Sequence, residues 1–172
     1  MSILKVNTIQ DRGGNAIISS DGSGTLTLNN DALKATPSFH AYSNTTTTTT
    51  TNVWTKVKMD TELYDSDSCF DTSAYRFTPT VAGKYYIYGA VRFGNSIDFD
   101  SCGMAIHKNG SRVVLQTGRT EHFNTYYVGT TIDFNGSTDY VEIYAWQNSG
   151  GTENFSGAND ETFFGGYKLI GA

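Results

Sequence analysis

Apolar and polar residues alternate along most of this chain with a period of two, the pattern that favours β-strands. No run of twelve residues carries apolar positions at the spacing of an amphipathic helix. Clusters of Gly, Asn, Asp and Ser separate the strand-like segments. About eight to ten such segments between residues 37 and 172 predict an all-β, antiparallel sandwich or jelly roll.

Two segments illustrate the pattern and one departs from it. Asn109-Gly110 stands between Met104–Lys108 and Arg112–Leu115, an arrangement that predicts a tight β-hairpin. The run of seven threonines from Thr45 to Thr51 favours extended backbone but has no alternation. We interpret this run as a loop that leads into the strand Val53–Val57.

The segment Lys84–Val91 is the strongest predicted strand, and both of its faces are apolar. Alternation places Tyr85, Ile87 and Val91 on one face. A strand in a monomeric sandwich usually exposes its second face to water. An apolar second face therefore predicts a subunit interface, formed by Tyr86, Tyr88 and Ala90.

Residues 1–36 form a separate unit of short strand-like runs and turns. The runs Ile3–Ile9, Ala16–Ile18 and Thr25–Leu28 are separated by turns at Asp11–Asn15 and Asp21–Gly24. Such short strands bury little surface by themselves. We therefore predict an N-terminal attachment segment over residues 1–36, stabilised by neighbouring copies or by a larger assembly, and a head domain over residues 37–172.

Composition and charge argue against two classes of partner, nucleic acids and membranes. The net charge is −5, without the clustered Lys and Arg that nucleic acids require. No apolar run approaches the length of a membrane span, and the N-terminus lacks the apolar region of a secretory signal. We expect synthesis in a cytoplasm and no nucleic-acid or membrane partner. For the two cysteines, Cys69 and Cys102, buried free thiols are favoured over a disulfide.

An ordered set of short motifs resembles the trimeric jelly-roll superfamily of the complement globular head and tumour necrosis factor. The matching segments are Pro37–Ala41, Tyr75–Pro79, Gly83–Ile87, Lys108–Gly110 and Phe164–Leu169. The resemblance covers residues 37–172. It implies a ten-stranded jelly roll, assembly as a homotrimer and binding rather than catalysis. Because the chain has no glycine at every third position, it lacks the collagen stalk of complement-type proteins.

The N-terminal segments Ile3–Ile9 and Gly13–Ile17 resemble the start of many tailed-phage fibre and accessory virion proteins. This second resemblance implies a bacteriophage virion protein that is assembled in the host cytoplasm. The favoured interpretation is a trimeric fibre or knob that attaches through residues 1–36 and adheres to a host-surface glycan. Two alternatives remain open: a capsid decoration or connecting protein that does not bind the host, and a free complement-like lectin.

The polar loops of the head are the candidate ligand-binding sites. The segments 118–124 and 147–156 place aromatic side chains among amides and hydroxyls, which suits contact with sugars, although they are equally well interpreted as solvated connections. The candidate residues are Arg119, His122, Phe123, Asn148, Asn154 and Phe155.

The sequence gives only weak signals for a metal site or for catalysis. The acids of segment 64–71, with Asp98 and Asp100, could supply oxygen ligands to calcium, but they lack the glycine and terminal glutamate of a helix-loop-helix calcium site. Solvated loop acids are favoured. His40, His107 and His122 show neither metal-ligand spacing nor a nucleophile motif. We therefore predict no cofactor, no metal and no enzymatic activity.

Overall fold

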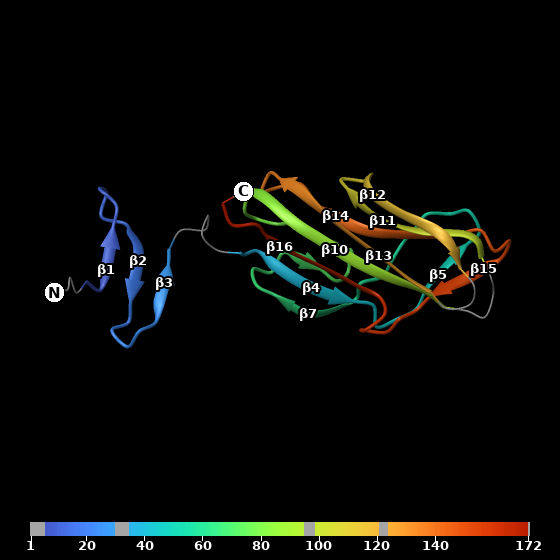
Figure 1. The fold of residues 1–172 in the computed structure, drawn as a ribbon, viewed down its shortest axis with the longest axis horizontal. Coiled ribbons are helices and arrows are strands. Elements are labelled where there is room, and N and C mark those ends of the chain that lie inside the picture. The colour runs from blue at the N-terminus through green and yellow to red at the C-terminus, as the bar shows by residue number, and fades with distance from the viewer. Residues whose placement is uncertain (1–5, 30–34, 95–98, 121–123, 172) are drawn as a thin grey trace.

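The computed structural model describes residues 6–29, 35–94, 99–120 and 124–171. These residues form sixteen strands and no helix. Two large sheets pack face to face as a sandwich, and a three-stranded sheet lies beyond one end of it (Figure 1). The predicted all-β, antiparallel jelly roll is therefore confirmed. The described residues of the sandwich form sheets of seven and six strands, more strands than the predicted ten.

The first large sheet is organised around its long central strand β10, which pairs with β13 along its whole length and with β16 on the other side. All of its pairings are antiparallel. Its strands are β4 (Ser38–Tyr42), β5 (Thr47–Thr50), β7 (Thr61–Asp65), β10 (Gly83–Gly94), β13 (Asn124–Phe134), β15 (Thr152–Phe155) and β16 (Phe163–Lys168).

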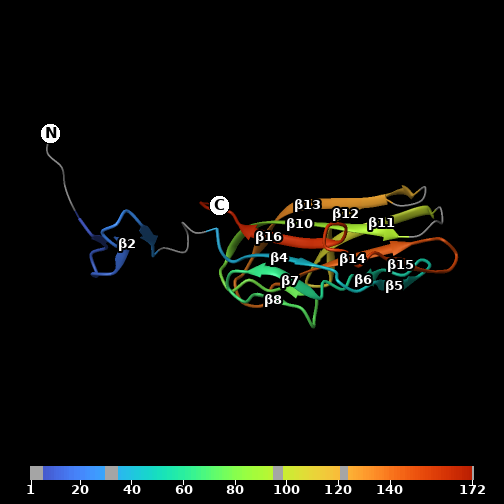
Figure 2. The same cartoon turned by 90° about the horizontal axis from the view of Figure 1, so that it is seen from below.

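The second large sheet has β11 between β12 and β14. The predicted hairpin joins β11 to β12, and Asn109 and Gly110 both have positive φ, at 51° and 78°. Asn and Gly tolerate this left-handed conformation, so the prediction is confirmed. Figure 2 shows β13 along one side of the sandwich and β7 and β8 along the other. The strands of the second sheet are β6 (Thr55–Lys56), β8 (Phe70–Asp71), β9 (Arg76–Phe77), β11 (Phe99–Lys108), β12 (Ser111–Thr120) and β14 (Val141–Gln147).

The core lies between the two sheets and is rich in aromatic rings. Phe39 stacks on Phe77 with ring centroids 4.1 Å apart, and Tyr85 meets Phe134 edge-on at 5.1 Å. The Tyr85 hydroxyl donates a hydrogen bond of 2.7 Å to the carbonyl of Val81, which satisfies its polar end inside the core. The inward positions Tyr85, Ile87 and Val91 are fully buried, as the alternation predicts.

Cys69 and Cys102 are both buried and neither forms a disulfide, which confirms the expectation for them. The Cys69 sulfur lies 3.6 Å from the hydroxyl oxygen of Thr80. These thiols pack as small apolar groups within the sandwich.

Two predicted loops contain strands. Thr47–Thr50 is β5, with Thr47 and Thr49 buried, and it pairs with β15, which occupies part of the predicted loop 147–156. The seven-threonine run therefore does not form a loop throughout. A uniform run hides its inward and outward positions, and only the pairing with a distant segment selects them.

The N-terminal sheet contains β1 (Thr8–Gln10), β2 (Ala16–Ser20) and β3 (Leu26–Leu28). Its two turns are closed in the same way. The Oδ1 atom of Asp11 accepts hydrogen bonds from the backbone amides of residues 13 and 15, and that of Asp21 accepts them from residues 23 and 25. Hydrogen bonds led by that from Ser23 lower the pKa of Asp21 to about 2.

No residue from 6 to 29 is fully buried in the single chain. Val6, Ile9 and Leu26 are exposed by 51%, 49% and 66%. With Ile18 they line a shallow apolar hollow in the small sheet. This agrees with the expectation that so small a sheet buries little surface by itself.

Candidate trimer interface and ligand-binding loops

The outer surface of the first sheet carries a continuous group of aromatic side chains, which we call the aromatic face. Its members come from five neighbouring strands, so only the folded sheet assembles them. They are His40 of β4, Tyr64 of β7, Tyr86 and Tyr88 of β10, Tyr127 of β13, and Phe163 and Tyr167 of β16.

The rings of the aromatic face contact one another across the sheet. Tyr86 lies between Tyr88 and Tyr167, with ring centroids 6.2 and 5.9 Å away. Tyr88 meets Phe163 edge-on at 6.3 Å, and Phe163 lies 6.5 Å from Tyr127. Aromatic pairs favour such offset and edge-on arrangements.

Two glycines allow the tyrosine rings to lie across the sheet. A Cβ atom at Gly129 would collide with the hydroxyl of Tyr86, and one at Gly165 would collide with the ring and hydroxyl of Tyr88. Gly129 and Gly165 are the cross-strand neighbours of Tyr88. The missing side chains thus leave room for rings that cover the backbone and form a flat surface.

His40 is the histidine of the aromatic face. Its Nδ1 atom lies 3.1 Å from the hydroxyl oxygen of Tyr88, and its ring stacks on Phe163 at 5.4 Å and on Tyr64 at 6.4 Å. Partial burial lowers the pKa of His40 below its ordinary value of 6.5. The imidazole is therefore neutral at pH 7, so this part of the face carries no charge.

Two ion pairs lie near the ends of β10, beside the aromatic face. Lys84 forms an ion pair of 2.7 Å with Asp133 near one end of β10, and Arg92 pairs with Glu161 near the other. Burial raises the pKa of Tyr88 to about 12 and that of Tyr127 to about 12. The face is thus apolar and uncharged, while Tyr64, Tyr127 and Tyr167 remain 46%, 49% and 42% exposed in the single chain.

The structure places the predicted interface residues at the centre of this face. Tyr86 and Tyr88 are half-buried and point outward, whereas Ala90 is 1% exposed and lies between Tyr127 and Phe163 in the register. Ala90 therefore supports the surface and offers little contact area of its own. Sequence reasoning missed the other members, because only strand pairing brings them beside β10.

The predicted ligand loops are less open than expected. Phe155 belongs to β15, is fully buried and meets Phe93 edge-on at 5.0 Å, so its assignment as a ligand residue is wrong. The side chain of Asn154 is exposed and accepts a hydrogen bond of 3.0 Å from Thr48. Asn148 accepts one of 2.7 Å from the backbone amide of Ser101, which ties its loop to β11.

The second predicted loop is shorter than expected. Arg119 is an exposed residue of β12, and its carbonyl accepts a hydrogen bond of 2.8 Å from the Tyr126 hydroxyl. His122 and Phe123 lie outside the described residues. The predicted ligand residues that the structure describes therefore do not form one site.

The acids of segment 64–71 stabilise turns in the structure. Asp65 accepts a hydrogen bond of 2.7 Å from the backbone amide of Phe70, and Asp71 accepts bonds from the amides of residues 73 and 74. Asp98 and the side chain of Asp100 lie outside the described part of the chain. Within that part, no three His, Cys, Asp or Glu side chains are grouped to hold a metal ion.

Comparison with solved structures identifies the fold. The Eiger tumour necrosis factor of S. frugiperda superposes with a TM-score of 0.60 at 12% identity, over 81% of this chain and 96% of that chain. Murine APRIL gives a TM-score of 0.59 at 16% identity, over 77% and 98%. The globular domain of zebrafish complement 1qA gives 0.56 at 15% identity, over 79% and 98%.

The head of this chain therefore has the jelly-roll fold shared by tumour necrosis factors and complement globular heads. No family model and no curated protein matches the sequence. Among the described residues, no helix is long and apolar enough to cross a membrane.

Proposed function

We propose that this chain is a homotrimeric binding head of a bacteriophage virion, a fibre or knob that adheres to a host-surface glycan and attaches to other virion proteins through residues 1–36. It acts by binding rather than by catalysis. The observation that carries the proposal is the aromatic face, because it gathers apolar area on the outside of a sheet whose inner side already forms the core.

The chemistry of the aromatic face supports a subunit interface. Tyrosine is enriched at the centre of protein interfaces, where charged residues are depleted. The neutral His40, the elevated pKa of Tyr88 and the paired charges near the ends of β10 all fit a surface that a second copy covers. The fold shared with tumour necrosis factor and the complement head supports three copies rather than two.

The N-terminal sheet supports attachment. Its apolar side chains are exposed in the single chain, and its sequence resembles the start of tailed-phage fibre and accessory proteins. Packing of three copies, or docking on a larger virion protein, would cover this surface. The virion location is part of the proposal and rests on that resemblance.

The first test is the mass of the purified protein by light scattering, for the full chain and for residues 37–172. Both are expected to be trimers, because the aromatic face lies wholly within the head. A monomeric head would overturn the interface, and with it the trimeric fibre.

A second test separates the fibre from the two alternatives. A fibre binds both host cells and virion components, and it loses only the virion binding when residues 1–36 are removed. A decoration protein binds particles and leaves host cells alone. A free lectin binds sugar and has no affinity for particles.

A further inference from the structure

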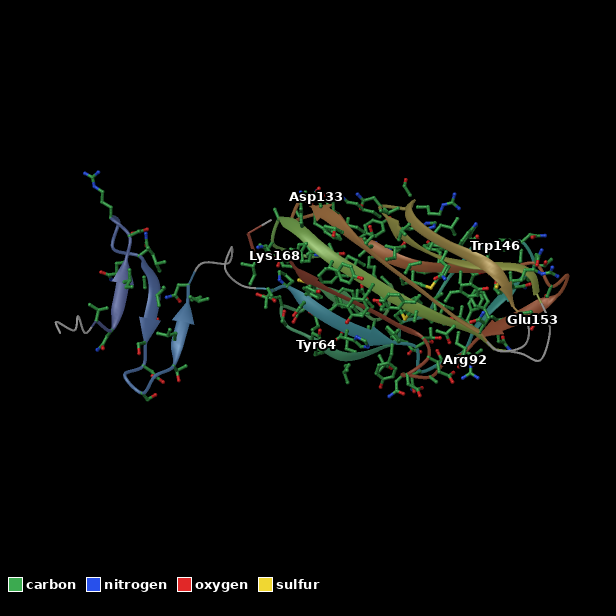
Figure 3. All side chains as sticks on the ribbon, in the orientation of Figure 1. Tyr64, Arg92, Asp133, Trp146, Glu153 and Lys168 are labelled. Carbon is green, nitrogen blue, oxygen red and sulfur yellow. The ribbon has the colours of Figure 1, made fainter. Side chains whose placement is uncertain are left out.

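The outer surface of the second sheet holds another aromatic group, which we call the aromatic platform. It consists of Trp54, His107, Tyr144 and Trp146, with Arg112 beside them. Trp54 precedes β6, and the others come from β11, β12 and β14. In Figure 3, Trp146 lies with the strands of this second sheet, whereas Tyr64 of the aromatic face lies beside β4 and β7.

The platform rings lie close together over small residues. Trp54 is 5.9 Å from Trp146 and 6.1 Å from His107, and the ring of His107 stacks on that of Tyr144 at 4.3 Å. A Cβ atom at Gly103 would lie 2.9 Å from the indole nitrogen of Trp146, which therefore covers the backbone of β11. All four rings remain partly exposed, so the platform offers aromatic surface to a ligand.

The platform also carries positive charge, although the chain as a whole is acidic. The guanidinium of Arg112 lies 5.9 Å from the Trp54 ring. Lys56 and Arg76 share one buried carboxylate, that of Glu142, at 2.7 and 3.4 Å. Among the described residues, the three cations Lys56, Arg76 and Arg112 outnumber the two carboxylates near them, those of Glu142 and Asp71.

One polar atom of the platform has no partner. The Nε2 atom of His107 is buried and lacks a hydrogen bond. Buried polar atoms in proteins are nearly always paired, so an unpaired one at the base of an aromatic surface points to a ligand group.

We propose that the aromatic platform binds an acidic sugar, a pyranose that carries a carboxylate. Its apolar C–H face would stack on Trp54 and Trp146, and its carboxylate would pair with Arg112, whose planar donors match that group. This inference rests on the proposed function and gives the glycan a site other than the predicted loops. The platform and the aromatic face belong to different sheets, so assembly through the aromatic face leaves the platform accessible.

The two tryptophans of the chain, Trp54 and Trp146, are both in the platform, so tryptophan fluorescence of the full chain reports on this site. The acidic probe is a hyaluronan octasaccharide, in which glucuronate alternates with N-acetylglucosamine. The neutral probe is fully N-acetylated chitohexaose, which contains N-acetylglucosamine alone. We expect a saturable change in emission with hyaluronan and about tenfold weaker binding of chitohexaose, because the charge-assisted contact is missing.

Arg112→Gln is expected to weaken hyaluronan binding about tenfold for the same reason. Lys84→Gln is the matched control, since it removes one positive charge from the first sheet. Both positions are exposed, and circular dichroism of each variant checks that the head remains folded. Absence of saturable binding, equal binding of the two probes, or equal loss in both variants would overturn the proposal.

Binding of the same proteins to host cells separates this inference from the proposed function. If the full chain adheres to cells and Arg112→Gln adheres equally well, adhesion stands and the platform is overturned. If the full chain binds hyaluronan but no host cell, the platform stands and the proposed adhesion is overturned.

Discussion

The Nδ1 atom of His40 lies 3.1 Å from the hydroxyl oxygen of Tyr88 within the aromatic face. The pair joins β4 to β10 across the intervening strand β16. Because burial lowers the pKa of His40 and raises that of Tyr88, both groups are neutral at pH 7. A proton added to His40 would place a charge inside the proposed subunit interface.

Acid is therefore expected to weaken the trimer, and it should also destabilise the fold of each head. Unfolded chains protonate histidine near pH 6.5, whereas folded His40 requires a lower pH. The unfolded state then binds more protons as the pH falls below 6.5, so the free energy of unfolding decreases over that range. Melting and light scattering between pH 7.5 and about 5 would measure the effect.

His40→Gln should flatten the pH dependence of trimer dissociation. The pKa of His107 is also lowered, chiefly by burial, so this residue contributes to unfolding in the same direction. It lies on the other sheet, and His107→Gln should leave the pH dependence of dissociation unchanged. An equal effect of both substitutions on dissociation would rule out a role of His40 at the interface.

Tyr88→Asp should convert the trimer to monomers. A carboxylate buried without a partner costs about 3 kcal/mol or more, and each subunit would bring one. Val113→Asp is the control, because Val113 is 45% exposed on β12 of the other sheet. Light scattering of both variants gives the answer, and a Tyr88→Asp trimer of unchanged stability would disprove the interface.

Glu142→Gln should destabilise the head by about 2 to 3 kcal/mol. The Glu142 side chain is 3% exposed and neutralises Lys56 and Arg76, and the loss is moderated because those cations reach solvent at 28% and 36% exposure. Urea unfolding measures the change. Asp133→Asn, which breaks an exposed ion pair, should have little effect. Equal urea midpoints for the two variants would show that Glu142 does not stabilise the head through Lys56 and Arg76.

Phe155→Ala should cost about 3 to 5 kcal/mol, because it opens a cavity beside Phe93. The neighbouring exposed residue provides the contrast, since Asn154→Ala should change stability by less than about 1 kcal/mol. Thermal unfolding of the pair distinguishes a core residue from a ligand residue. A stable Phe155→Ala protein would restore the loop interpretation.

The regular strands could be predicted from the sequence because their patterns are local. Alternation along Lys84–Val91 correctly assigned its inner and outer positions, and Asn109-Gly110 located a hairpin. The ordered motifs correctly indicated the jelly-roll fold. None of these inferences required knowledge of which distant strands become neighbours.

The sites were harder to predict because pairing between distant strands creates them. Trp54 and Trp146 come together only when β6 pairs with β14. Tyr167 reaches Tyr86 only through the pairing of β16 with β10. Phe155 stands among polar residues in the sequence, and its burial follows from the pairing of β15 with β5, which the uniform threonine run concealed.

The backbone amide of Lys168 donates a hydrogen bond of 3.2 Å to the carbonyl of Pro37, so the chain enters and leaves the head at neighbouring points. A domain whose two ends lie side by side can be replaced as one unit. Replacing everything between those two points would exchange the head and leave the preceding small sheet untouched. Recombination at those two points would therefore exchange the whole head in one step, whereas point mutation changes it one residue at a time.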